Sequence, residues 1–354
     1  MKFNPRLVLP FFVMSLLVGI FGGWIRMGWG IDLEEGASHH GVIMTGGFLG
    51  GLISLERAST MKSRWWLAFP AMAGISILFF LMDFDLTAHL LITFTSAGLL
   101  ILCIERTLVR SESYWYFLLA GALFWLIGNL KLLQTDFVPA SVGWWIGFIL
   151  FTIFGERLEL SRFVPVPKTA KAIFWFLSCL LLISFLLPFH SIGRSVNAFA
   201  ILLLTVWFLR HDIARKSVRK PGIFRYTGLS MMVAYGWLVV HCIILMFKSG
   251  HSFFYDLYLH TFFLGFAFSM IWAHAPSILP AVLKLRVKLF HPVLWVFWWL
   301  FQLTLAGRVM VTFLAEPSSR KILVLINGIA LLLMLASMML ILVIRLRQRK
   351  RAAR

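Results

Sequence analysis

The stretch Ser38–Arg57, SHHGVIMTGGFLGGLISLER, shows the pattern that decides the fold of this chain. Two adjacent histidines open an apolar run that is rich in glycine and carries no charge until Glu56. An uncharged run of this length is typical of a segment that crosses a membrane. The direction in which it crosses decides on which side of the membrane the histidines lie.

The composition extends this interpretation to the whole chain. Of the 354 residues, 60% are hydrophobic and 13% are charged, and the mean hydropathy is +0.89. A soluble domain of this size must present a polar surface to water, so the composition indicates a polytopic membrane protein. We expect an all-α fold in which residues 1–345 form one transmembrane domain and residues 346–354 form a basic cytoplasmic tail.

Apolar runs separated by short connections predict twelve transmembrane helices in one bundle. The first run, which follows Lys2 and Arg6, has no small-residue cleavage site and is therefore expected to be a span and not a signal peptide. The predicted spans are 7–25, 40–55, 65–82, 86–103, 114–133, 139–155, 171–188, 193–209, 226–247, 256–280, 290–313 and 322–344.

The basic residues predict the orientation of these spans. Of the 33 lysines and arginines, 26 fall at the two termini and in every second loop, and 7 fall on the other side. Cytoplasmic loops carry the excess of lysine and arginine, so both termini are expected in the cytoplasm. The net charge of +19 follows this alternation and does not form one patch, which argues against a nucleic-acid partner.

Four histidines are predicted at a similar depth near the outer face, on four different spans: His40, His89, His241 and His260. Ionisable side chains inside a membrane are costly, and histidine nitrogens are common ligands of metals and haem iron. We therefore consider all four as candidate metal or haem ligands in a bundle core. The alternative is that each is an interfacial histidine bonded to a backbone carbonyl or to water.

The residues that follow His40 allow two interpretations. Met44, Gly47 and Gly51 share its helical face. Glycines four residues apart are typical of close contact between membrane helices. Alternatively, the absent side chains leave a slot for a flat macrocycle that His40 ligates, with Met44 and Gly47 beside it.

His260 opens a second candidate segment, which is rich in phenylalanine and ends at Pro276 and Pro280. We expect these prolines to kink or end the helix at its inner end. Arg308 is predicted in the outer part of the eleventh span. It either extends its charge to the interface or pairs with a haem propionate.

The segment His40-Gly41-Val42-Ile43-Met44 at the start of the second span is similar to the haem-ligand helix two of haem-copper oxidase subunit I. His260, Gly265 and Pro280 resemble helix ten of that family. Among such proteins the chain looks closest to the NnrS-type family of twelve-span bacterial membrane proteins linked to haem, copper and the nitric oxide response. The resemblance covers the topology of most of the chain but only two short motifs in detail.

The departures from the oxidase pattern are informative. The predicted sixth and seventh spans contain no histidine, and position 262 is Phe where the oxidases carry a second histidine. A complete oxygen-reducing binuclear centre is therefore not expected. The resemblance instead implies a single haem b held by His40 and His260, with copper as a second candidate.

Two functional hypotheses follow. In the first, the chain is a multi-pass protein of the bacterial cytoplasmic (inner) membrane that binds haem and acts in the response to nitric oxide or metal stress, without turnover of its own. In the second, it is a secondary transporter without cofactor, although the predicted span centres lack the charged residues that proton-coupled carriers use. A third reading is an assembly factor for a respiratory complex. Besides haem and membrane lipids, the sequence predicts no specific partner.

Overall fold

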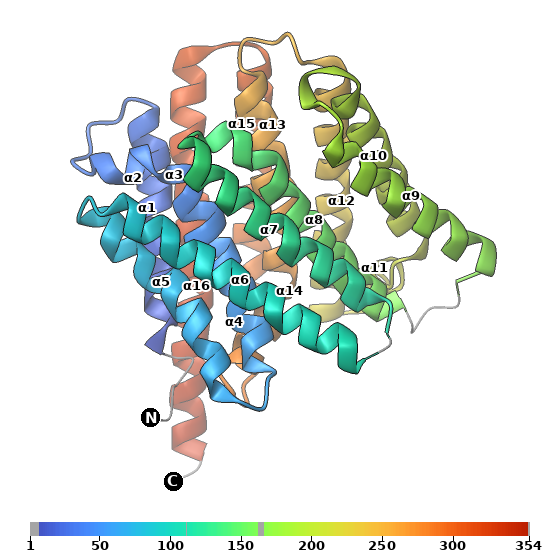
Figure 1. Cartoon of the computed structure of the whole chain (residues 1–354). Coiled ribbons are helices and arrows are strands. Elements are labelled where there is room, and N and C mark those ends of the chain that lie inside the picture. Colours follow the sequence, from blue (N-terminus) through green and yellow to red (C-terminus); the bar gives the residue numbers. More distant parts are fainter. Residues whose placement is uncertain (1–6, 111, 162–165, 353–354) are drawn as a thin grey trace. The chain divides into compact units, whose positions relative to one another are not determined.

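A computed structural model describes residues 7–110, 112–161 and 166–352 of the chain (Figure 1). Every regular element in this described part is a helix, which confirms the all-α prediction. Four residues that entered the charge count, Lys2, Arg6, Arg162 and Arg354, lie outside the described residues.

Eleven helices in the described part are long and apolar enough to cross a membrane, which supports a multi-pass membrane protein. These candidate spans are Leu9–Arg26, Arg64–Leu81, Asp85–Val109, Tyr114–Thr135, Val138–Leu160, Lys168–Leu186, Phe189–His211, Ile223–Phe247, Phe254–Val282, Leu294–Phe313 and Pro317–Arg349. They match eleven of the twelve predicted spans to within a few residues.

The predicted span 40–55 is helical but is not among these eleven. It consists of α3 (His40–Val42), the π-helix η2 (Ile43–Gly50) and α4 (Gly51–Ser59). Its glycines, together with His40 and the charged residues at its far end, keep its mean hydropathy low. Nearly all of η2 is buried, so this segment packs against protein and exposes little surface to lipid.

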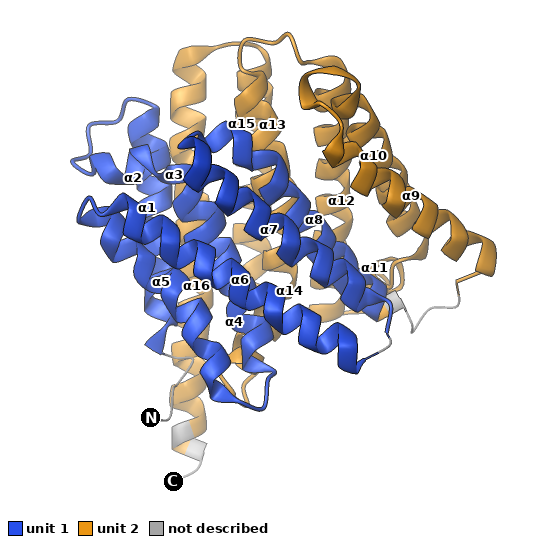
Figure 2. Ribbon diagram, in the orientation of Figure 1, with its two compact units in different colours: residues 1–159 blue, residues 160–354 orange. Residues whose placement is uncertain are grey.

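The chain divides into two compact units, residues 1–159 and 160–354 (Figure 2). Unit 1 contains α1 (Leu9–Arg26), α2 (Glu34–Ser38), α3, η2, α4, η3 (Arg64–Leu67), α5 (Ala68–Leu81), α6 (Asp85–Val109), α7 (Tyr114–Thr135) and almost all of α8 (Val138–Ser161). The arrangement of all spans in one bundle stays a prediction.

Unit 2 contains the remaining helices: α9 (Lys168–Leu186), η4 (Phe189–Gly193), α10 (Arg194–His211), α11 (Ala214–Ser217), α12 (Ile223–Phe247), α13 (Phe254–His260), the π-helix η5 (Thr261–Phe268), α14 (Ser269–Val282), α15 (Leu294–Phe313) and α16 (Pro317–Ala352). Pro276 and Pro280 lie inside α14, which ends two residues after the second proline.

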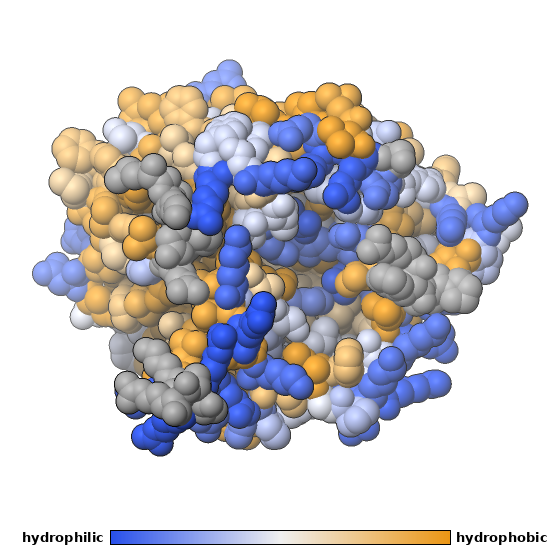
Figure 3. Space-filling view, turned by 90° about the horizontal axis from the view of Figure 1, so that it is seen from below, coloured by the Kyte–Doolittle hydropathy of each residue, from blue (hydrophilic) through white to orange (hydrophobic). Residues whose placement is uncertain are grey.

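The last helix is longer than predicted. α16 has 36 residues, so the predicted tail from residue 346 continues the helix to Ala352. At about 1.5 Å per residue, α16 exceeds the roughly 30 Å hydrocarbon core of a bilayer. Its arginine-rich end lies at the bottom of Figure 1, and Figure 3 shows many hydrophilic side chains on the face seen from below.

Hydrogen-bonded side chains join α12 and α15 to the first residue of α14, directly after η5. The indole nitrogen of Trp237 on α12 donates to the amide oxygen of Gln302 on α15, at 2.7 Å. The amide nitrogen of Gln302 donates to Ser269 Oγ at the start of α14, at 2.8 Å. Trp237 also covers Gly265 of η5, where a Cβ atom would lie 2.7 Å from the indole ring. These contacts hold the π-helix that follows His260 and the start of α14.

Candidate functional site

The most charged cluster inside unit 2 is centred on Asp256. Asp256 and His260 are four residues apart on α13 and therefore share a helical face. Nδ1 of His260 lies 2.8 Å from a carboxylate oxygen of Asp256 and 2.9 Å from its backbone carbonyl oxygen. Both neighbours are acceptors, so the hydrogen bonds assign the proton to Nδ1 and leave the lone pair of the neutral ring on Nε2.

Two arginines reach the same carboxylate from other helices. Arg308 on α15 places Nη2 3.5 Å from Oδ1 of Asp256, and Arg320 in the first turn of α16 places Nη2 3.4 Å from Oδ2. The guanidinium of Arg320 also lies over the ring of Phe253, 4.4 Å from its centroid. The four side chains Asp256, His260, Arg308 and Arg320, here called the Asp256 cluster, are between 9% and 21% exposed.

The Asp256 cluster has a net positive charge. Two guanidinium groups face one carboxylate, and the Nε atoms of Arg308 and Arg320 are buried without a hydrogen-bond partner. A buried, uncompensated charge is costly unless a counter-ion completes the site. The cluster is therefore suited to take an additional anionic group, such as a carboxylate, beside the Nε2 edge of His260.

Sequence reasoning found only part of this cluster. His260 and Arg308 were predicted as site residues, and the structure brings both onto the same carboxylate. Asp256 and Arg320 were missed. The spacing of Asp256 and His260 at the start of a span was a usable signal, because residues four apart on a helix face each other.

His40 in unit 1 is held differently. Its Nδ1 lies 2.7 Å from the backbone carbonyl oxygen of Gly19 on α1, which again assigns the lone pair to Nε2. The ring lies against Gly23, one turn further along α1, where a Cβ atom would come within 3.3 Å of the imidazole. Met44 covers Gly19, so His40 and Met44 occupy neighbouring glycine positions of one helix.

The glycines of η2 and the start of α4 are covered by protein. A Cβ atom would meet Ile92 at Gly46, Ser15 at Gly47, Trp125 at Gly50 and Phe12 at Gly51. At Gly50 it would lie 2.2 Å from the indole ring of Trp125. Of the two interpretations, close helix packing is therefore the one these contacts support, and the side chains stand where the predicted slot would be.

Both candidate ligand helices contain a π-helix directly after the histidine. η2 begins three residues after His40, and η5 begins at the residue after His260; each has eight residues. π-helical segments are rare in proteins and are found frequently at functional sites. The only other π-segment in the described residues, Phe189–Gly193, is interrupted by the non-helical backbone of Ser191.

His89 lies among aromatic rings at the start of α6. Its ring centroid is 5.3 Å from that of Phe80 and 5.9 Å from that of His39. His39, which directly precedes α3, pairs through Nε2 with Asp85 at 3.0 Å. Nε2 of His89 is buried without a partner.

His241 on α12 is fully buried. Its Nδ1 lies 3.1 Å from the carbonyl oxygen of Tyr258 and 3.4 Å from Oγ1 of Thr261, residues that flank His260 in the chain. Its ring stacks on that of Tyr258. His241 therefore packs against the junction of α13 and η5.

Within the part of the chain that the structure describes, no three His, Cys, Asp or Glu side chains are arranged to hold a metal ion. His40 and His89 belong to unit 1, whereas His241 and His260 belong to unit 2. The predicted metal site formed by all four histidines stays a prediction. The arrangement most suited to a ligand within one unit is the Asp256 cluster.

No curated protein and no solved structure matches the chain. One family, described as a domain of unknown function (DUF8744), matches residues 6–343, which is nearly the whole length. The chain is a member of the DUF8744 family.

Proposed function

We propose that this chain is a haem-binding protein of the cytoplasmic membrane in which His260 would ligate haem b. The observation that carries the proposal is the Asp256 cluster. A ligating histidine usually donates its other ring N–H to a carboxylate or carbonyl, which fixes the ring and raises the basicity of the ligating nitrogen. Asp256 supplies both acceptors to His260.

The two arginines of the Asp256 cluster are a second feature that suits haem. Haem carries two propionates, and Arg308 and Arg320 present two guanidinium groups with buried, unpartnered Nε atoms. A propionate beside these arginines would offset the one positive charge that Asp256 leaves uncompensated. When bound, the haem would supply an iron that can exchange electrons.

His40 stays a predicted second ligand on the strength of the resemblance, because it belongs to unit 1 and His260 belongs to unit 2. Nδ1 of His40 is fixed by the carbonyl of Gly19, so its Nε2 would be the ligating nitrogen, as in His260. A π-helix follows each histidine, which supports a functional role for each of them, because such segments are frequent at functional sites. A role in the response to nitric oxide or metal stress, copper as a second metal, and kinship with the NnrS-type family remain predictions from the resemblance.

The proposal includes a topology of twelve spans with both termini in the cytoplasm. The charge distribution supports it, because 26 of the 33 basic residues then lie on the inner side. A reporter enzyme that is active only in the periplasm, fused after Arg354, is expected to be inactive. The same reporter inserted after Gly250, between α12 and α13, is expected to be active; the reverse pattern would overturn the topology.

The haem proposal is tested by the absorbance spectrum of the purified full chain. We expect a Soret band and about one haem per chain, with at least a tenfold loss of haem in His260→Ala and in His40→Ala. His211→Ala, in which the histidine lies at the other end of unit 2 beside Trp207, is the matched control and should keep its haem. A folded, colourless wild-type chain, or equal haem content in all three variants, would overturn the proposal.

A cofactor-free transporter is the second candidate. The observation that favours it is the same positively charged cluster beside the irregular helix η5, because carriers often bind anionic substrates at interrupted helices. In that case the purified chain is colourless, and Arg308→Gln abolishes the uptake of an anion by vesicles. A haem-loaded chain without transport excludes this candidate.

A further inference from the structure

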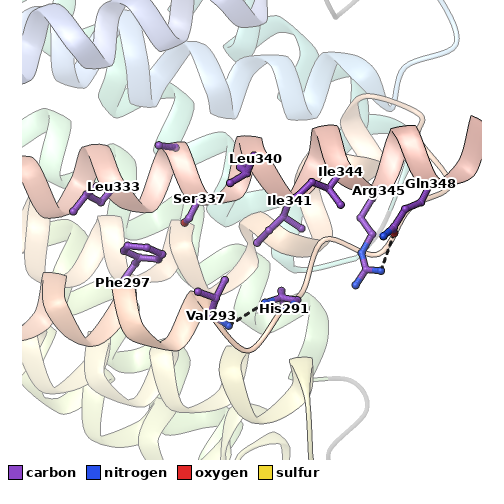
Figure 4. A pocket seen from close by; sticks show the side chains of 11 residues that line it. His291, Val293, Phe297, Leu333, Ser337, Leu340, Ile341, Ile344, Arg345 and Gln348 are labelled. Atoms are coloured by element: carbon purple, nitrogen blue, oxygen red, sulfur yellow. Dashed lines mark hydrogen bonds between the residues drawn. The ribbon is translucent and has the colours of Figure 1, made fainter.

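Unit 2 contains a groove between α15 and α16 that the haem proposal does not use. The groove has a volume of about 530 Å³ (Figure 4). Its walls are mostly apolar, with Phe297 on α15 opposite Leu333 and Ser337 on α16. One end is polar, where His291, Arg345 and Gln348 line it.

The apolar part has the length of one lipid leaflet. On α16 it extends from Leu333 to Ile344. Eleven steps at about 1.5 Å give roughly 17 Å along the helix. Half of a hydrocarbon core of about 30 Å is about 15 Å. Arg345 and Gln348, which follow this part directly, therefore lie at the depth of the headgroups when the apolar part lies among acyl chains.

The residues that line the polar end of the groove are basic or neutral, and no acidic residue is among them. Nη1 of Arg345 donates to Gln348 Oε1 at 3.3 Å, so Arg345 is held at the mouth by a neutral partner. Lys284, Arg286 and Lys288 precede His291 in the same loop. Between residues 257 and 354 the sequence has one acidic residue, Glu316, which lies between α15 and α16 at their other ends.

We propose that this groove binds one anionic phospholipid from the leaflet at the arginine-rich end of α16. One acyl chain lies along the apolar part, and the phosphate lies against Arg345 and His291. The matched length selects a membrane lipid over a water-soluble ligand, and the basic mouth selects an anionic headgroup over a zwitterionic one. The groove shares no residue with the Asp256 cluster, so this inference is independent of the haem proposal.

Native mass spectrometry of the purified full chain tests this inference. The chain is incubated in detergent with equimolar phosphatidylglycerol and phosphatidylcholine that carry different isotopic labels. We expect one phosphatidylglycerol per chain to be retained preferentially. Arg345→Gln is expected to lower its retention about fivefold, which is the effect of one basic residue near an anionic lipid.

Two matched controls distinguish lipid binding in the groove from nonspecific effects of charge and of helix packing. Arg349→Gln removes an exposed arginine of the same helix that does not line the groove and should leave retention unchanged. Ala336→Trp fills the groove without changing charge and should abolish retention, whereas Met339→Trp, outside the groove, should not. Inorganic phosphate added in excess should not displace the lipid.

The inference is overturned by equal retention of the two lipids. It is also overturned if Arg349→Gln weakens retention as much as Arg345→Gln, or if Ala336→Trp retains phosphatidylglycerol as the wild type does. Displacement by inorganic phosphate alone would show that the mouth binds a free anion and that the apolar part contributes nothing.

Discussion

The surroundings of His40 and His260 differ, although both histidines are followed by an eight-residue π-helix. His40 lies in unit 1 against the backbone of α1, and its partner is the neutral carbonyl of Gly19. His260 lies in unit 2 beside the carboxylate of Asp256, which two arginines also contact. One histidine is fixed by close packing, and the other is fixed by charge.

This difference bears on which of the two histidines is better suited to ligate haem. A carboxylate partner raises the basicity of the opposite ring nitrogen more than a neutral carbonyl does. The arginines that suit propionates also lie beside His260. In unit 1 the ring of His40 lies against two glycine positions of α1, Gly19 and Gly23.

The largest expected effect is the loss of Asp256. In Asp256→Asn the two guanidinium groups lose their counter-ion, and we expect the free energy of unfolding to fall by about 3 kcal/mol. The matched change in unit 1 is Asp85→Asn, because Asp85 also pairs with a histidine but is 39% exposed. That change should cost less than about 1 kcal/mol. Thermal unfolding in detergent measures both, and equal losses would contradict the charge-based account of unit 2.

The next effect concerns packing in unit 1. Gly50→Ala places a Cβ atom 2.2 Å from the ring of Trp125, and we expect a loss of about 2 kcal/mol. Gly236 on α12 is the control, because a Cβ atom there meets nothing within 4 Å. Gly236→Ala should be neutral or stabilising by up to about 1 kcal/mol. If Gly50→Ala is tolerated as well as Gly236→Ala, then Trp125 does not pack tightly on η2.

The smallest effect concerns the hydrogen bonds that join α12 and α15 to the start of α14. Gln302→Leu leaves the indole N–H of Trp237 and the hydroxyl of Ser269 without Gln302, and should cost about 1 kcal/mol. Leu303→Ala, on the exposed side of α15, should change stability by less than about 0.5 kcal/mol. A haem content that falls in Gln302→Leu but not in Leu303→Ala would show that these hydrogen bonds help to position His260. An equal haem content in the two variants would show that these hydrogen bonds do not affect His260.

The sequence was sufficient for the helical class and for eleven span positions, because apolar runs of about 20 residues have few alternatives in a membrane protein. It also selected the two histidines that precede the long π-helices, since histidine inside an apolar run is costly and conspicuous. The π-helices themselves were not predicted. They depend on tertiary packing, here of Trp237 on Gly265 and of Trp125 on Gly50.

Asp256 and Arg320 could not be placed from hydropathy alone. Both lie at helix starts, where a charged residue is ordinarily explained by the membrane interface. Only the packing of α13 against the ends of α15 and α16 brings Arg308 and Arg320 to one carboxylate. The glycines after His40 were conspicuous in the sequence, but their spacing suits both a slot for a macrocycle and a close helix contact. Only the positions of the neighbouring side chains distinguish the two.

The most direct test of the account is a titration of haem into the purified, haem-depleted chain, followed at the Soret band. We predict saturation at about one haem per chain with a spectrum of two histidine ligands. His260→Ala should bind at least tenfold more weakly, whereas His211→Ala should bind as the wild type does. Saturation with the same affinity in His260→Ala and wild type, or no specific binding to the wild type, would contradict the account.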